Sequence, residues 1–162
     1  MEDHGTPFKS RHKIARERIE SMKVIWTQDK AEYHGETVNF GPMMGWPKPV
    51  QKPYPPVIVG GAFPYGARRA IRYGDGWVPH ASRPEYGDVS DFLPQFHRMA
   101  KEAGRDPGSL PVTMFRVVEE LDRLRHYREI GIARVVITVP SAGGDKVLSI
   151  LDRWSETIRQ LG

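Results

Sequence analysis

The chain has 162 residues, of which 39% are hydrophobic and 27% charged, a composition typical of a soluble globular protein that can bury one core. The net charge of +4 comes from 24 basic residues scattered among 20 acidic ones, so no basic block indicates a nucleic-acid partner. The absence of cysteine excludes disulfides, thiolate metal sites and thiol nucleophiles, and redox chemistry would therefore need a bound cofactor.

No segment predicts a membrane helix or a secretory leader. An apolar run long enough to cross a bilayer would need roughly 18 residues, and none occurs. The N-terminal residues MEDHGTPFKSRHK lack the apolar centre of a signal peptide. We therefore expect a cytoplasmic protein with no membrane partner.

The first third of the chain predicts a helix, a hairpin and a connector. Thr6 and Pro7 match an N-cap and a first helical position, and apolar residues at helical spacing extend the predicted helix over about 7–27. Within 28–56, residues 32–40 predict a short surface hairpin around Gly35. Six of the fourteen prolines fall in 41–56, which predicts a stiff, extended connector.

Residues 57–162 predict four βα units, because short apolar runs alternate with longer helical patterns. The predicted strands cover 57–59, 77–80, 111–118 and 134–139. The predicted helices lie near 64–73, from 90 or 91 to 103, before Gly131, and from about 145 onward. The start of the second helix is placed there because Pro94 is tolerated only in a first turn.

Two of these helices carry a clear apolar stripe. In the second, the inward residues are predicted to be Leu93, Phe96, His97, Ala100 and Ala103. In the last, the predicted buried stripe is Val147, Leu148, Leu151, Trp154 and Ile158. The pattern as a whole predicts one α/β domain over 1–162, belonging either to an open doubly wound sheet or to part of a (β/α)₈ barrel, which takes roughly 250 residues to close.

The junction of the first strand and its helix is the strongest candidate for a ligand site. The strand ends on Gly60 and Gly61, and a helix starts shortly after. Free backbone amides and the positive end of a helix dipole favour an anion, and glycines allow a phosphate to approach closely. The alternative is a tight turn that needs glycine for its backbone conformation alone. Arg68, Arg69 and Arg72 are interpreted first as a solvated helix face, and second as added positive potential.

His80 is the best-placed histidine, because the end of a strand is where parallel α/β folds bind ligands. A structural role is the simpler interpretation of one histidine. The other histidines show no ligand spacing, so no metal site is predicted, and no Gly-x-Ser-x-Gly motif indicates a nucleophilic serine. The tryptophans, Trp77 among them, are interpreted as core and packing residues.

Seven short motifs occur in a recognisable order. They are Gly5-Thr6-Pro7-Phe8 with Arg11, Met22 to Thr27, His34-Gly35-Glu36, Pro47 to Pro53, Pro55 to Gly61, Tyr73 to Trp77, and Gly104-Arg105-Asp106-Pro107. In this order they closely resemble the second half of the bacterial luciferase-like monooxygenase family.

The resemblance implies half of a (β/α)₈ TIM barrel, with four βα units that correspond to barrel strands five to eight. It implies a flavin- or deazaflavin-dependent oxidoreductase whose cofactor, FMN or a deazaflavin coenzyme, contacts Gly60, Gly61 and Ala62 through its phosphate and faces His80 and Ala81. Many relatives have a hydroxyl or amide residue after the two glycines, whereas Ala62, Phe63 and Pro64 leave only backbone amides to bind phosphate.

The resemblance also implies that Met1 falls where relatives leave the fourth strand, so that the first four strands, which form much of the flavin and substrate pocket, are not in this sequence. Activity of this chain alone is therefore left open, and no catalytic residue is assigned. One alternative is a non-catalytic half-barrel that self-associates as a homodimer through its unpaired edges and at most binds a phosphorylated ligand. Another is a small doubly wound domain that binds a different phosphorylated ligand.

Overall fold

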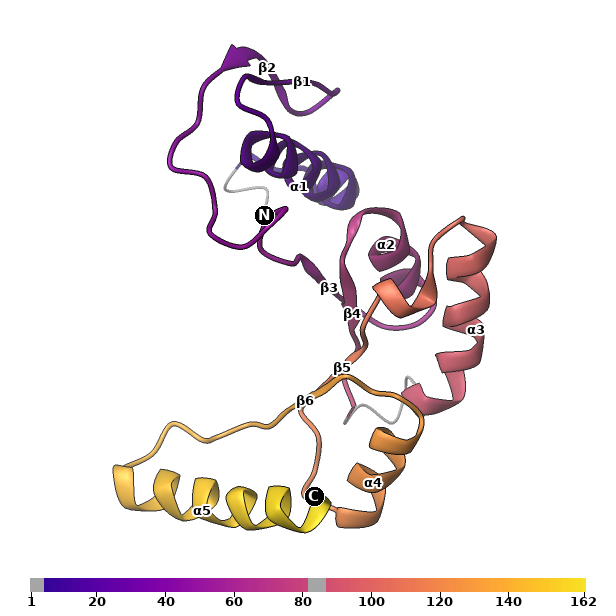
Figure 1. The fold of residues 1–162 in the computed structure, drawn as a ribbon, viewed down its shortest axis with the longest axis vertical. Coiled ribbons are helices and arrows are strands. Elements are labelled where there is room, and N and C mark those ends of the chain that lie inside the picture. The colour runs from indigo at the N-terminus through magenta and orange to yellow at the C-terminus, as the bar shows by residue number, and fades with distance from the viewer. Residues whose placement is uncertain (1–4, 82–86) are drawn as a thin grey trace. The chain divides into compact units, whose positions relative to one another are not determined.

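The chain forms two compact units, Met1–Val57 and Ile58–Gly162. The computed structural model describes residues 5–81 and 87–162 (Figure 1). The assignment of residues 1–162 to one domain stays a prediction.

The first unit is built on helix α1, which spans Arg11–Thr27. A single 3-10 turn, Phe8–Ser10, precedes it. The predicted end at Thr27 is confirmed, but the predicted start is wrong: Pro7 has an extended backbone, and neither it nor Ser10 caps the helix through a side chain. The first turn is instead held by the guanidinium of Arg11, which donates to the carbonyl of Phe8 at 2.7 Å and lies over its ring.

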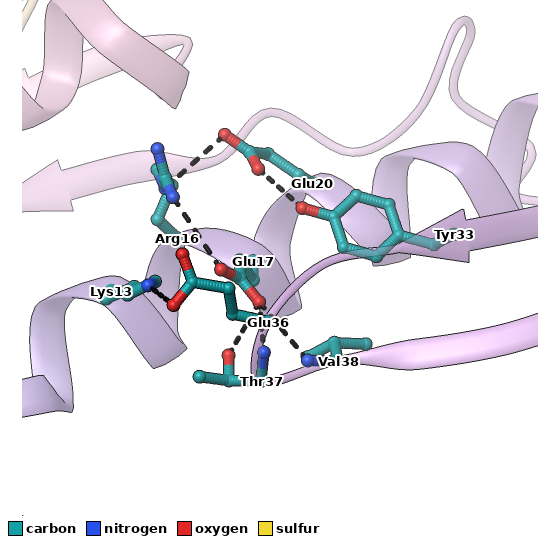
Figure 2. A network of polar contacts seen from close by, with 8 residues as sticks. All are labelled: Lys13, Arg16, Glu17, Glu20, Tyr33, Glu36, Thr37 and Val38. Atoms are coloured by element: carbon teal, nitrogen blue, oxygen red, sulfur yellow. Dashed lines mark hydrogen bonds and ion pairs between the residues drawn. The ribbon is translucent and has the colours of Figure 1, made fainter.

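The predicted hairpin is confirmed as two antiparallel strands, β1 (Ala31–His34) and β2 (Asn39–Met43). The carboxylate of Glu17, on α1, accepts hydrogen bonds from the amide and hydroxyl of Thr37 and from the amide of Val38, at 2.7, 2.7 and 3.2 Å (Figure 2). These bonds, led by that from the Thr37 amide, lower the pKa of Glu17 to about 2. One buried carboxylate therefore fixes the hairpin turn against the helix.

A second polar contact joins the same two elements. The hydroxyl of Tyr33, on β1, donates to the carboxylate of Glu20 at 2.7 Å (Figure 2). Burial, followed by this hydrogen bond, raises the pKa of Tyr33 to about 12. The phenol therefore stays protonated and keeps its donor role through the physiological range.

The predicted connector over 41–56 is partly strand, because β2 extends to Met43, whereas residues 44–56 form neither helix nor strand. They are nevertheless attached to the end of α1. The ammonium of Lys48 donates to the carbonyls of Ile25 and Gln28, both at 2.6 Å, which satisfies carbonyls that a helix end leaves without partners. The rings of Trp26 and Tyr54 add an aromatic contact with centroids 6.1 Å apart.

The second unit contains the predicted four βα units. Its strands are β3 (Ile58–Gly60), β4 (Gly76–Val78), β5 (Thr113–Phe115) and β6 (Arg134–Val136). The helices that follow them are α2 (Tyr65–Tyr73), α3 (Val89–Glu102), α4 (Leu121–Glu129) and α5 (Gly144–Leu161) (Figure 1). The alternation of strand and helix is thus confirmed.

The four strands lie side by side in chain order and are all parallel. β3 pairs with β4, and β5 pairs with β6. Two parallel bridges, Trp77 to Val112 and His80 to Phe115, join the pairs. The strands β5 and β6 are shorter than the predicted runs 111–118 and 134–139, and β5 ends at Phe115 because Arg116 departs from strand conformation.

Helices α2 and α3 cover the β3–β4 side of this sheet. α2 packs on both strands and on α3. The buried residues there include Val59, Ala67, Ala70, Trp77, Leu93, Phe96 and Ala100. Two predictions for α3 are wrong: Ala103 is exposed, and Pro94 lies inside the helix because the helix starts at Val89. Asp88 caps that start by accepting from the amide and hydroxyl of Ser90 at 2.9 and 2.7 Å.

The predicted buried stripe of α5 is mostly wrong. Trp154 is buried, but Leu148, Leu151 and Ile158 are 57%, 41% and 64% exposed. The periodicity correctly gave an apolar face, yet the main helix contact of α5 within the described residues is with α4, and much of its apolar face stays exposed. No helix of the described ranges is long and apolar enough to span a membrane.

Candidate functional site

The turn between β3 and α2 has the backbone that its two glycines allow. Gly60 is the last residue of β3, and Gly61 has a φ of +130°, which side-chain-bearing residues rarely adopt. The turn also lies directly on the first turn of α2. A Cβ placed on Gly66 would lie 2.1 Å from the carbonyl oxygen of Gly61, so only glycine fits at residue 66.

Two side chains hold this turn through its carbonyls. The indole Nε1 of Trp77, on β4, donates to the carbonyl of Gly61 at 2.9 Å. Nη2 of Arg69, on α2, donates to the carbonyl of Gly60 at 3.1 Å. A Cβ on Gly61 would lie 2.4 Å from the same Nη2, which shows how closely the guanidinium covers the turn.

The amides of the turn remain available to a ligand. Within residues 5–81 and 87–162, the amides of Gly61, Ala62 and Phe63 donate no hydrogen bond, whereas that of Gly66 donates to the carbonyl of Ala62 at 2.6 Å. Pro64, the N-cap residue of α2, has no amide hydrogen and makes no side-chain cap. Three backbone donors and one guanidinium therefore gather at the N-terminal end of α2, an arrangement suited to a small anion.

His80 and Ala81 lie just beyond β4, at the same edge of the sheet as Gly60. β4 is the neighbour of β3, and Gly60 pairs with Val78, two residues before His80. The amide of Ala81 donates to the carbonyl of Phe115 at 2.8 Å, so it is already engaged with β5. The His80 ring meets the Phe115 ring edge-on, with centroids 5.5 Å apart. The predicted residues thus occupy the carboxyl ends of adjacent strands, and their contact with a cofactor stays a prediction.

Arg69 and Trp77 have roles at the turn that the sequence interpretation missed. Arg68 and Arg72 are exposed, as the interpretation of a solvated helix face requires, but Arg69 reaches back over the glycines. Trp77 is fully buried against Phe63 and Phe96, yet its indole also bonds the turn. The only signal in the sequence was the position of Arg69 about two helical turns after Gly61, which does not by itself show where the side chain points.

The structure gives no cluster for metal binding in the part of the chain it describes. Within these ranges, no group of three or more histidine, aspartate or glutamate side chains is placed to hold a metal ion. Between helices α3 and α4, Nη2 of Arg123 donates to the carboxylate of Asp88 at 2.9 Å. Burial opposes ionisation of Asp88, but the bonds from Ser90 and the charge of Arg123 outweigh it and lower the pKa of the carboxyl. This pair fastens α3 to α4.

The sequence profile of the family described as "Luciferase-like monooxygenase" matches residues 1–119. An uncharacterised protein of Mycobacterium tuberculosis is 35% identical over 156 residues, which cover 93% of this chain and 52% of that protein. The F420-dependent hydroxymycolic acid dehydrogenase of the same organism is 30% identical over 105 residues, covering 64% of this chain and 27% of the enzyme. The FMNH₂-dependent dimethylsulfone monooxygenase of Pseudomonas putida is 32% identical over 75 residues, covering 46% and 21%.

A solved enzyme structure has a similar fold. The structure of an F420-dependent secondary alcohol dehydrogenase, in complex with an F420–acetone adduct, superposes with a TM-score of 0.54 at 18% identity. The match covers 94% of this chain and 55% of that one. The chain thus spans about half the length of the M. tuberculosis relative, and it matches part of a luciferase-like barrel. From the match of its sequence to the family profile, this chain belongs to the luciferase-like monooxygenase family.

Proposed function

We propose that this chain carries the cofactor-phosphate site of an oxidoreductase that uses FMN or a deazaflavin coenzyme. The observation that carries the proposal is the β3–α2 turn, where the free amides of Gly61 and Ala62 lie beside the guanidinium of Arg69. The named relatives that use F420 or FMNH₂ support the choice of cofactor class. In this proposal the four strands correspond to barrel strands five to eight.

The residues of the turn fit a phosphate in charge and in space. Gly60 has no side chain, and the nearest atom to a Cβ placed there is 3.9 Å away, so its surface is open to a ligand. Arg69 supplies a positive charge, and the amides supply donors that need no reorganisation. A reduced flavin or deazaflavin supplies the hydride equivalent when bound. The residues of this chain would hold its phosphate and place its ring near His80 and Ala81, at the carboxyl end of β4.

A fluorescence titration with FMN and with coenzyme F420 tests the proposal. The matched variants are Arg69→Met and Arg72→Met, which remove the same charge from one helix, but only Arg69 bonds the turn. We expect the wild-type chain and Arg72→Met to bind one cofactor alike, and Arg69→Met to bind it about tenfold more weakly, as loss of a charge-assisted bond requires. Absence of binding to both cofactors, or equal affinity in both variants, would contradict the proposal.

A second candidate function is a self-associating half-barrel, and the exposed face of α5 favours it. Leu148, Leu151 and Ile158 are exposed together on one helix, and Phe115 is 40% exposed at the sheet. Grouped apolar side chains of this size mark interaction surfaces. Light scattering should then give about twice the 18.4 kDa mass of one chain. A monomer at all concentrations would contradict this candidate.

A further inference from the structure

Arg116, directly after β5, has a backbone that arginine rarely adopts. Its φ is +61°, and among the residues that the structure describes it is the only one other than glycine with a positive φ. This left-handed conformation costs free energy for an L-residue with a long side chain, and asparagine, aspartate or glycine would tolerate it better. Such residues concentrate where a ligand is bound.

The neighbouring strands hold Arg116 in this conformation from both sides. The carbonyl of Phe115 accepts from the amide of Ala81 at 2.8 Å, and the amide of Val117 donates to the carbonyl of Val136 at 3.2 Å. The kink therefore lies between a bond to the β4 side and a bond to β6. Nε of Arg116 donates to the hydroxyl of Thr138, just after β6, at 3.2 Å. The guanidinium is thus fixed at the carboxyl ends of two adjacent strands.

A cavity of about 320 Å³ opens beside this guanidinium. Arg116 and Thr138 form part of its polar wall, and Ile150 and Trp154 of α5 form part of its apolar wall. The volume lies at the lower end of the range of small-molecule sites, about 300–1,000 Å³, which also combine apolar walls with a few placed polar groups. The carboxyl ends of parallel strands are where α/β folds bind such ligands.

The positive charge of Arg116 is not neutralised in this cavity. The other two charged residues of the wall, Glu119 and Arg153, form an ion pair with each other, and Glu119 also accepts from the hydroxyl of Thr157 at 2.9 Å. Within the described ranges Arg116 forms no ion pair, and its two terminal nitrogens donate no hydrogen bond. Two parallel N–H groups are therefore free to meet one carboxylate.

We propose that Arg116 and Thr138 bind the carboxylate of a small organic acid whose apolar part lies against Ile150 and Trp154. The planar guanidinium gives the site its preference for a carboxylate, and the apolar wall gives it a preference for an attached hydrocarbon chain. None of these four residues belongs to the Gly60–Gly61 turn, so either proposal can fail without the other.

Calorimetric titration of the full 162-residue chain with hexanoate, hexan-1-ol and inorganic phosphate tests the site. Hexan-1-ol has the same chain length without the charge, and phosphate has charge without the hydrocarbon. The variants are Arg116→Met and, as a matched loss of charge, Arg125→Met, whose arginine pairs with Asp122 on the surface of α4.

We expect hexanoate to bind more tightly than either of the other two probes. Arg116→Met should weaken hexanoate binding about tenfold or more, while Arg125→Met should leave it unchanged. Equal binding of hexanoate and hexan-1-ol, equal or tighter binding of phosphate, or an unaltered affinity in Arg116→Met would each overturn the proposal. Arg116→Gly is the second variant, because glycine relieves the strained φ; it should fold at least as stably as the wild type and still lose hexanoate binding. Retained binding in this variant would equally overturn it.

Discussion

On the β3–β4 side of the second unit, helices α2 and α3 bury a continuous set of apolar side chains around Trp77, whereas on the β5–β6 side α5 leaves much of its apolar face exposed. Both sides arise from the same repeated βα pattern. The difference lies in what each helix packs on: α2 packs on two strands and a neighbouring helix, whereas α5 packs mainly on α4. The first side is therefore the better packed of the two, and the proposed phosphate turn lies on that side.

The largest expected contrast is between two buried tryptophans. Trp77→Ala should destabilise the protein by about 3–5 kcal/mol, because it removes a fully buried ring and its bond to the Gly61 carbonyl. Trp154→Ala should cost less, under about 3 kcal/mol, because the rest of the apolar face of α5 is largely exposed. Urea unfolding monitored by circular dichroism compares them. Equal costs would show that the two sides are packed alike.

Two glycines at helix starts have different surroundings on the two sides. Gly66→Ala should destabilise the protein by about 1–3 kcal/mol, because the new Cβ would overlap the carbonyl of Gly61. Gly144 is the first residue of α5 and has no atom within 4 Å of its Cβ position, so Gly144→Ala should be neutral or stabilise by up to about 1 kcal/mol. Thermal unfolding compares the stabilities of the two variants. An unchanged stability of Gly66→Ala would mean that the turn does not pack on α2 in this way.

The first unit should respond to acid through Glu17. Its pKa is about 2 in the folded protein, below the usual 4.5, so its ionised form stabilises the fold above pH 4.5, and this contribution is lost as the pH falls toward 2. Glu17→Gln should therefore lower the stability at pH 7 and flatten its acid dependence. Glu36→Gln, which removes the exposed partner of Lys13, is the control and should change little. Unfolding curves between pH 2 and 7 that are parallel in wild type and Glu17→Gln would refute this role.

The smallest effect on stability is expected on α5. Leu151→Asp should change the stability of an isolated chain by no more than about 0.5 kcal/mol, because Leu151 is exposed. If α5 forms the proposed interface between two chains, the same change should shift the mass toward that of a monomer. Lys146→Asp, which also places an aspartate on the exposed surface of α5 but removes no apolar side chain, is the control. A dimer that survives Leu151→Asp would place the interface elsewhere.

The order of elements could be predicted from the sequence, because periodicity and glycine positions reflect local backbone preferences. The four βα units, the hairpin and the end of α1 at Thr27 all appear as predicted. The burial of α5 could not be predicted, since periodicity gives an apolar face but not what covers it. The start of α3 was misjudged because capping by Asp88 outweighs the cost of Pro94 inside the helix.

The candidate site was predictable only in its backbone part. Gly60 and Gly61 follow directly from the strand–glycine–helix pattern. The contributions of Arg69 and Trp77 depend on how α2 and β4 are placed on the turn, which no local pattern contains. Arg116 was missed for the same reason: its left-handed backbone arises from bonds to two strands that are distant in sequence.

Binding of the cofactor phosphate at the β3–α2 turn can be tested directly by ¹⁵N NMR of the backbone amides during addition of FMN or coenzyme F420. The β3–β4 side is proposed to hold the cofactor phosphate, so the amide signals of Gly61 and Ala62 should move with one of the two cofactors. The signals of Gly143 and Gly144, at the N-terminal end of α5 on the β5–β6 side, should not change. Shifts of the Gly143 and Gly144 signals without a shift of the Gly61 signal, or no shift with either cofactor, would contradict phosphate binding at this turn.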